Sequence, residues 1–412
     1  METRAPLVTP VLVVGAIILL ISFGVRASFG VFQIPIAEEF GWARAEFSLA
    51  IAIQNLFWGI GQPLFGAIAE KIGDRRAIVM AAILYAGGLV LSAFATTPFA
   101  MQSLEVLVGL GIAGTSFGVI LAVVGRASSD ANRSMSLAIA SAVGSSGQVI
   151  GPPLAEGLMS VMPWQVVFLV FAGTIILSLL ALPLMRAPSV SRAELEESMG
   201  TVLVRAFRDP SYAMIFMGFF ACGYHVAFYP AHLPALVTEM CGPILPGSVL
   251  HGMGITTTSA LGAVAISLIG VFNIAGTLAA GWLGNRFPKK YLLSSIYALR
   301  TIVAAAFSLA PITPATVLLF AAAMGSLWLA TVPLTSGLVA HLYGIRYMGT
   351  LYGFVFFSHQ IGGFLGVWLG GRLYDTTGNY ELVWWLGVAV GAFSALVHLP
   401  IREEKRGVLQ AG

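Results

Sequence analysis

The stretch VLVVGAIILLISFGVRASFGVFQI at residues 11–34 decides the fold class, because it holds a single charged residue, Arg26, in 24 positions. A helix crosses the roughly 30 Å hydrocarbon layer of a bilayer with about 20 predominantly apolar residues. This stretch is therefore predicted to be a membrane-spanning helix. It is too long for the apolar core of a signal peptide and lacks a convincing cleavage site, so we expect it to remain in the mature protein.

Apolar runs of this length recur along the chain. Of its 412 residues, 58% are hydrophobic and only 9% are charged, whereas soluble domains carry roughly 25% charged residues. Spanning segments must be helices or closed barrels, and these runs are too long for barrel strands. We expect an all-α membrane protein with twelve spans, at about 11–34, 46–68, 77–97, 100–125, 135–158, 163–185, 211–237, 257–284, 290–310, 314–340, 348–371 and 381–400.

The basic residues predict the orientation of these spans. If the N-terminus lies in the cytoplasm, 17 of the 21 Lys and Arg residues fall in cytoplasmic segments, which is the usual bias. We therefore expect a multi-pass protein of the cell (inner) membrane, surrounded by the lipid bilayer, with both termini cytoplasmic. The net charge of +3 is too small to indicate a nucleic-acid partner.

The two halves of the chain carry an internal repeat. Residues 23–35 (FGVRASFGVFQIP) align without gaps to residues 222–234 (CGYHVAFYPAHLP), and this places His225 opposite Arg26 with an offset of 199. Residues 66–76 and 281–290 match with an offset of 215, and residues 146–151 and 358–363 with an offset of 212. The repeat predicts two six-helix bundles, residues 1–186 and 210–412, joined by a cytoplasmic linker at 187–209, with a substrate site between them.

The segment after the second span carries a family resemblance. Gly66-(x3)-Glu70-Lys71-x-Gly73-Asp74-Arg75-Arg76 resembles the loop signature of the major facilitator superfamily, with Glu70-Lys71 in place of the usual Asp-Arg pair. The repeat-related segment in the second half, residues 281–290, matches this signature less well. This resemblance covers essentially the whole chain and implies a secondary transporter that works by alternating access. It assigns Glu70, Asp74, Arg75 and Arg76 to an inner gate.

Within that superfamily, the chain most resembles bacterial relatives of the monocarboxylate and oxalate/formate carriers. Arg26 lies near the sequence position at which monocarboxylate carriers have a lysine. His359 lies at the position at which oxalate/formate carriers have a lysine. Residues 133–144 partly match a conserved helix 5 segment, whereas Thr277 occupies the place of an expected arginine. The resemblance implies a small organic anion as substrate, a monocarboxylate above all, moved by proton symport or by exchange.

Polar residues inside the spans are the candidates for substrate contact, because a charge at the centre of a helix costs roughly 2.5–3.5 kcal/mol. Arg26 comes first, since a guanidinium can hold a carboxylate through two hydrogen bonds. The alternative is an arginine held by backbone carbonyls or an ion pair. His225, its repeat mate, is a candidate proton carrier, or else a buried hydrogen-bonded histidine. The full set is Arg26, His225, Asn273, Arg300, His359 and Gln360.

Other positions leave two interpretations open. His359 and Gln360 differ by ~100° around their helix, so at most one of them faces the substrate fully, and we favour His359. Arg300 either binds substrate or pairs with a neighbouring helix. Glu105 is expected near the outer end of its span, either solvated or in a gate, so that no acidic residue remains at mid-depth.

The sequence also argues against other classes of protein. It contains neither a metal-binding spacing nor a cluster of nucleophile and base, and its two cysteines are expected to be unpaired. We therefore expect no enzyme activity, catalytic residue, metal or cofactor, and we expect a monomer. The main alternative function is export of neutral or lipophilic metabolites or drugs. A polytopic membrane enzyme or sensor is the third possibility.

Overall fold

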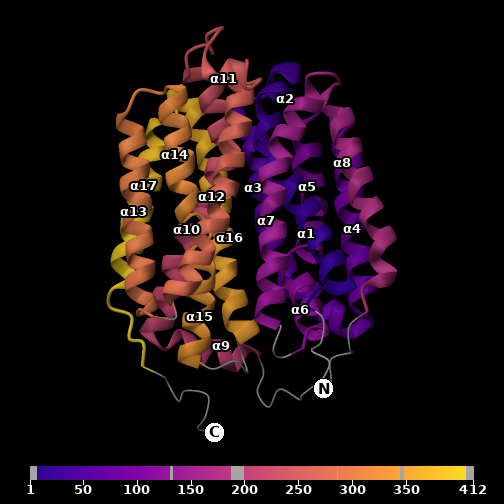
Figure 1. The fold of residues 1–412 in the computed structure, drawn as a ribbon, viewed down its shortest axis with the longest axis vertical. Helices are drawn as coiled ribbons and strands as arrows, with labels where there is room; N and C mark the ends of the chain where they lie inside the picture. Colours follow the sequence, from indigo (N-terminus) through magenta and orange to yellow (C-terminus); the bar gives the residue numbers. More distant parts are fainter. Residues whose placement is uncertain (1–6, 130–132, 187–198, 285, 344–347, 405–412) are drawn as a thin grey trace.

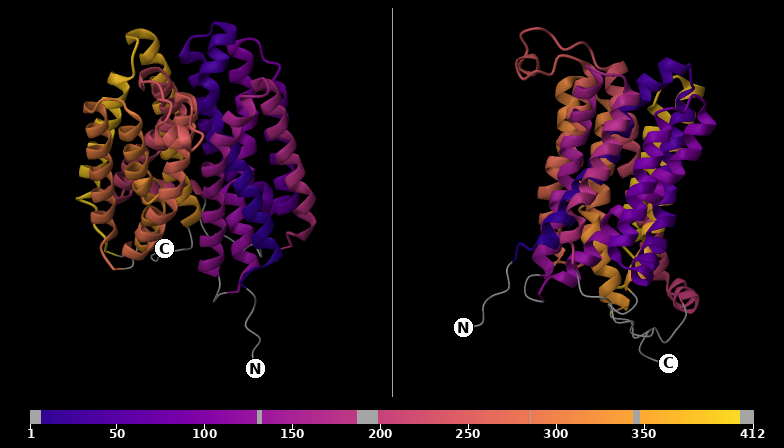
Figure 2. Two further views of the ribbon diagram at one scale, coloured as in Figure 1. Left: turned by 45° about the horizontal axis from the view of Figure 1, so that its top comes forward. Right: turned by 90° about the vertical axis from the view of Figure 1, so that its right-hand side faces the viewer.

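A computed structural model describes residues 7–129, 133–186, 199–284, 286–343 and 348–404. The described chain forms two helical bundles side by side (Figure 1). The far end of the molecule, as we call it, carries α2 (Gln33–Phe40) and α11 (Val249–Gly252) (Figure 1). The opposite end, which we call the terminal end, carries α6 (Phe117–Ala127), α9 (Met199–Phe207) and α15 (Thr331–Tyr343). The views in Figure 2 show the same two bundles from other sides.

Residues before 186 form the first bundle. Several of its helices begin at clear capping signals, as at Thr9 and Thr97, whose side chains accept from backbone amides ahead of a first-turn proline. Its elements are α1 (Pro10–Ser28), η1 (Phe29–Phe32), α2 (Gln33–Phe40), α3 (Arg44–Ile72), α4 (Asp74–Ser92), α5 (Pro98–Thr115), α6 (Phe117–Ala127), α7 (Arg133–Met159), α8 (Trp164–Ser178) and η2 (Leu179–Leu184).

The second bundle follows a short helix, α9. Asp209 caps the first long helix of this bundle, and Thr313 and Thr316 form a capping box at another. Its elements are α9 (Met199–Phe207), α10 (Pro210–Met240), α11 (Val249–Gly252), α12 (Thr258–Gly284), α13 (Lys289–Leu309), α14 (Pro314–Leu327), α15 (Thr331–Tyr343), α16 (Met348–Thr377) and α17 (Glu381–His398).

The helix lengths confirm the all-α membrane fold. Within the described ranges, nine helical segments are long and apolar enough to cross a membrane. Helices α3, α7 and α16 have 29, 27 and 30 residues, so each is also long enough. The exact limits of the predicted bundles and linker stay a prediction. Residues 187–198 lie outside the described part, and α9 occupies most of the rest of the linker.

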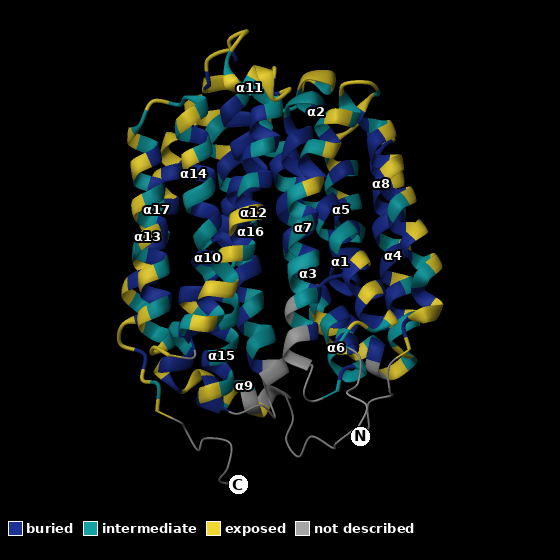
Figure 3. Cartoon of the chain, viewed as in Figure 1, coloured by how far each residue is buried: buried dark blue, intermediate teal, exposed yellow. Residues whose placement is uncertain are grey.

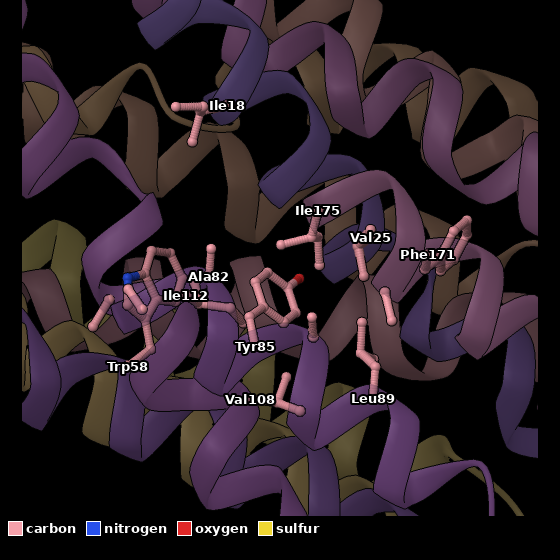
Figure 4. Close-up of a cluster of buried hydrophobic side chains, with 14 of the residues drawn as sticks. Ile18, Val25, Trp58, Ala82, Tyr85, Leu89, Val108, Ile112, Phe171 and Ile175 are labelled. Atoms are coloured by element: carbon pink, nitrogen blue, oxygen red, sulfur yellow. The ribbon is translucent and has the colours of Figure 1, made fainter. Parts of the chain in front are cut away.

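Buried side chains gather in two clusters, one in each bundle. The first cluster runs from Val11 to Met185 and takes in only three residues from the second bundle, and the second cluster runs from Ala206 to Ile401. Figure 4 shows part of the first cluster around Tyr85. Many exposed side chains are large and apolar, such as Phe94 and Leu180 at 72% and 75% exposure. In Figure 3 exposed positions mark the outer faces of both bundles, as expected for surfaces that lipid covers.

The bundles touch along α3 with α16, α7 with α12, and η1 with α10. Small residues permit the closest of these approaches: a methyl group on Gly30 would overlap the carbonyl oxygen of Pro230. Ser267 of α12 donates a hydrogen bond to the carbonyl of Val149 in α7 (2.6 Å). Side chains at these seams therefore lie between the two bundles, where the repeat predicts a substrate site.

Candidate functional site

Arg26 lies near the end of α1, at the side of the first bundle that meets the second. It is partly accessible, whereas its neighbours Val25 and Ala27 are buried. Its Nη2 donates to Oδ1 of Asn55 (2.9 Å), and its guanidinium carbon lies 4.7 Å from the ring centre of Trp58. The tryptophan face favours the cation and fixes the plane of the guanidinium.

An aromatic contact joins this arginine pocket to the second bundle. The Trp58 ring packs edge-on against Phe356 of α16, with centroids 5.5 Å apart and planes at 71°. At the next residue, Gly59, an added methyl carbon would lie 2.7 Å from Cβ of Gln360. Arg26 is therefore separated from the second bundle by one aromatic ring.

His359 and Gln360 lie on the other side of that contact. Phe356 stacks on the His359 ring (5.3 Å, 9°), and Nδ1 of His359 is 3.2 Å from Oε1 of Gln360. Both are buried, at 4% and 1% exposure, and Nε2 of Gln360 has no partner among the described atoms. The structure thus gathers Arg26, His359 and Gln360 around Trp58 and Phe356.

His225 lies elsewhere. Its side chain is fully buried inside the second bundle, where Nε2 is 2.9 Å from the carbonyl oxygen of Gly387 in α17. Its ring stacks on Tyr229 with centroids 5.7 Å apart. The structure does not bring His225 together with Arg26, although the repeat puts the two at equivalent positions.

Arg300 and Asn273 both bind a break in a helix, between Leu327 and Thr331, where α14 ends and α15 begins. Arg300 Nε and Nη2 donate to the carbonyl oxygen of Leu327 at 3.0 and 2.6 Å. Oδ1 of Asn273 accepts from the amide of Leu329 (3.0 Å). A break leaves backbone groups unpaired, and unpaired groups are costly away from water. These two side chains supply the missing partners.

The same region holds a sulfur and a spare cationic donor. Arg300 is fully buried, and its Nη1 has no hydrogen-bond partner in the described residues. Sγ of Cys222 lies 3.1 Å from Oγ1 of Thr331 and within electrostatic range of Arg300. Thr277, which occupies the place of the expected arginine, donates to Oδ1 of Asn273 (3.0 Å).

The residues assigned to an inner gate lie within the first bundle. Asp74 pairs with Arg126 of α6 at 2.6 Å. Arg75 donates from Nε and Nη2 to the carbonyls of Met185 and Pro183, at 2.9 and 3.0 Å. Arg76 is exposed, and the side chain of Glu70 lies outside the described residues. The described contacts thus hold α4 to α6 and η2, and the gating role stays a prediction.

A polar network at the far end does join the bundles. Arg44, at the start of α3, pairs with Glu239 at the end of α10. The amides of Arg44 and Ala45 donate to the two carboxylate oxygens of Asp375 in α16 (3.0 and 2.7 Å). A carboxylate at a helix N-terminus also meets the positive end of the helix dipole. Sequence reasoning did not single out these charges.

Arg44 has a further partner at this end. It donates from Nη1 to the hydroxyl of Tyr380 (3.1 Å) in the segment before α17. Burial raises the pKa of the Tyr380 hydroxyl to about 12, so this group is neutral at ordinary pH. The far end is therefore held together by groups from α3, α10, α16 and the start of α17.

Sequence reasoning also missed the partners of Arg26 and misplaced Glu105. Glu105 is buried at 1% exposure and accepts from Nε2 of Gln54 (2.8 Å), so the expectation of a solvated outer position is wrong. The sequence feature that could have predicted these contacts is the polar pair Gln54-Asn55 inside an otherwise apolar span. Asn55 turns to Arg26 and Gln54 turns to Glu105.

Comparison with known proteins agrees with this architecture. The family model described as Major Facilitator Superfamily matches residues 14–367. The uncharacterized MFS-type transporter YcxA of Bacillus subtilis is 23% identical over 91% of this chain and 90% of that protein. Monocarboxylate transporter 13 of Bos taurus is 27% identical over 90% and 83%. Multidrug resistance protein MdtH of Yersinia enterocolitica is 28% identical over 90% and 89%.

The fold has a solved counterpart. The crystal structure of a D-xylose-proton symporter superposes with a TM-score of 0.74 at 13% identity, covering 96% of this chain and 99% of that one. At this identity the likeness concerns the fold. The family match, which spans most of the sequence, carries the assignment: this chain is an integral membrane transporter that belongs to the major facilitator superfamily.

Proposed function

We propose that this transporter carries a small organic anion, a monocarboxylate being the expected class, and that the anion binds to Arg26. The observation that carries the proposal is the state of that guanidinium. The Arg26 residue is partly accessible, its Nε has no partner among the described atoms, and no described carboxylate lies within ion-pair distance of it.

Such a guanidinium is suited to an anion. Arginine has five N–H donors in a plane, and Asn55 accepts from one nitrogen of Arg26. A carboxylate that accepts two of the remaining donors would neutralise the charge and form a charge-assisted pair. Trp58 and Phe356 offer apolar surface to the short carbon chain of the same molecule.

The contacts between the bundles support transport by alternating access. The Arg44–Glu239 and Asp375 contacts hold the far end closed, so we propose that substrate enters and leaves this state at the terminal end. The excess of basic residues there supports a cytoplasmic terminal end in the cell membrane. Opening to the other side would break the far-end contacts as the bundles rock.

The named relatives support two substrate classes. Monocarboxylate transporter 13 favours the anion, whereas multidrug resistance protein MdtH favours the alternative, an exporter of neutral or lipophilic molecules. One observation fits that alternative: Phe23, Phe117 and Trp58 pack around the Arg26 region, and such rings also suit an apolar ligand. The charge dependence of binding separates the two.

The test is binding and exchange in liposomes that contain the purified protein. We expect labelled monocarboxylates to exchange across the wild-type protein, and Arg26→Ala to weaken binding roughly 10- to 100-fold, since a hydrogen bond to a charged group contributes about 1.5–3 kcal/mol. Arg286→Ala is the matched control, because Arg286 also stacks on a tryptophan, Trp282, but is exposed. Equal anion binding by wild type and Arg26→Ala would contradict the proposal.

A further inference from the structure

Glu105 of α5 is a buried acid with only half of its carboxyl group satisfied. Gln54 donates to its Oε2 (2.8 Å), while Oε1 has no partner among the described atoms. The side chain is only 1% exposed. A carboxylate is costly in an apolar interior unless a positive charge compensates it. The charge state of Glu105 must therefore depend on what lies near it.

The polar layer around Glu105 is shared with Arg26. Gln54 and Asn55 are adjacent on α3, and they bind Glu105 and Arg26 respectively. Tyr85 of α4 contributes to the same layer, because its hydroxyl donates to the carbonyl of Ser22, one turn before Arg26 (3.1 Å). The adjacent residues Gln54 and Asn55 therefore link the two groups, and no direct contact between Glu105 and Arg26 occurs among the described atoms.

Few other ionisable groups surround this pair. Helix α5 packs against α1, α3, α4 and α6. In the middle of those helices the titratable groups are Arg26 on α1 and Tyr85 on α4. The others lie toward the helix ends: Arg44, Glu46, Glu70 and Lys71 on α3, Asp74, Arg75 and Arg76 on α4, and Arg126 on α6. Arg26 is thus the cation available to Glu105 in the interior of the first bundle.

We propose that Glu105 carries the proton that is coupled to anion transport, an inference that rests on the function proposed above. Two states of the pair have no net charge: ionised Glu105 with Arg26, and protonated Glu105 with Arg26 and a bound anion. A net charge in the low-dielectric interior is costly. The bundles therefore reorient in only two states. In one, Glu105 is ionised and no anion is bound; in the other, Glu105 is protonated and an anion is bound to Arg26.

The proton step is a simple acid–base exchange. At one side, the Glu105 carboxylate takes a proton from water and the anion binds to Arg26, so that the anion supplies the negative charge that the protonated carboxyl no longer carries. At the other side, the O–H bond of the carboxyl breaks, the proton passes to water, and the anion leaves. Gln54 donates to the same carboxyl oxygen in both protonation states, so the side chain keeps its place.

The experiment compares two modes of transport in liposomes. Exchange of labelled for unlabelled anion at equal pH needs only the loaded carrier, whereas accumulation driven by a pH gradient needs the empty carrier to return. Glu105→Gln imitates the protonated acid, so we expect it to retain exchange and to lose pH-driven accumulation at least tenfold. Glu46→Gln is the matched control, because Glu46 also accepts from a glutamine amide, that of Gln102, across α3 and α5 (2.8 Å) but is partly accessible.

The outcomes separate the two proposals. No carboxylate exchange by the wild type would remove the proposed function itself. Wild-type exchange together with unimpaired pH-driven accumulation by Glu105→Gln would overturn only the role of Glu105. If Glu105→Gln loses exchange as well, Gln54→Leu decides. It keeps the acid but removes a hydrogen bond that favours the carboxylate, so the pH midpoint of accumulation moves upward, and an unmoved midpoint overturns the inference.

Discussion

The two bundles place their internal arginines at different repeat positions. In the first bundle the cation is Arg26 on α1, and Tyr85 on α4 is neutral. In the second, the offset of 199 puts His225 opposite Arg26, and the offset of 215 puts Arg300 opposite Tyr85. Arg26 is partly accessible between the bundles, whereas Arg300 is fully buried on α13.

Broken helices explain why the two cations differ. The α5–α6 break at Ser116 and the α14–α15 break near Trp328 are equivalent, and so are Trp58 and Asn273, which bind them. In the second bundle Arg300 also serves the break, through Leu327. In the first bundle Tyr85 donates to Ser22 instead and Arg26 is left at the interface. The guanidinium of Arg300 is therefore occupied by the Leu327 carbonyl, whereas the guanidinium of Arg26 keeps donors for a ligand.

The largest effect should come from the place where the bundles touch. Gly30→Ala puts a methyl group onto the Pro230 carbonyl, whereas its repeat mate, Tyr229, fills the core of the second bundle. We expect the far end to be held open and transport to be lost. Spin-label distances across the far end would measure the opening. Gly157→Ala, with open space around it, is the control. Unchanged distances would contradict the contact.

The second prediction separates the two arginines. Arg300→Ala leaves the Leu327 carbonyl without its two donors, so we expect the purified protein to lose about 2 kcal/mol of stability, or more if a void remains. Arg26→Ala should leave stability nearly unchanged while anion binding falls. Thermal unfolding of both variants in detergent measures this difference. A stable Arg300→Ala protein with weakened anion binding would instead make Arg300 a substrate residue.

The third prediction concerns the two side chains at the breaks. Asn273→Ala should cost about 1–2 kcal/mol, because the buried Leu329 amide loses its acceptor. Trp58→Phe removes the hydrogen bond to Ser116 but keeps a ring beneath Arg26, so about 1 kcal/mol is expected. Only Trp58→Phe should also alter anion affinity. If Asn273→Ala alters it equally, the two bundles share the site more evenly than the contacts indicate.

The smallest effect is expected at the terminal end of the first bundle. Asp74→Asn breaks the pair with Arg126, whose side chains are 22% and 26% exposed. Partly exposed pairs contribute about 0–1 kcal/mol, so stability should hardly change. Transport rates then test the gate: a rate equal to that of the wild type would remove Asp74 from it, and a charge-swapped Asp74→Arg, Arg126→Asp protein that restores a lost rate would support it.

The sequence predicted which residues lie in long apolar helices. It did not predict which neighbouring helix each polar side chain contacts. Spans and repeats follow from apolar length and register, so the helical fold and the place of Arg26 within a long apolar helix could be predicted. The surroundings of His225 could not, because Gly387 and Gly391 in distant α17 leave room for its ring. The burial of Glu105 likewise depends on Gln54, which lies 51 residues earlier in the chain.

The interruptions at Ser116 and Trp328 have a mechanical consequence. Sharp bends occur where the hydrogen-bonded ladder of a helix is broken. Near Trp328 the loose backbone groups are held by Arg300 and Asn273, and at the other break Trp58 donates to the Ser116 hydroxyl. Each interrupted helix therefore consists of two segments that meet at a break held by neighbouring side chains. We therefore expect α6 and α15 to change their angle to α5 and α14 at these two points when the bundles rock.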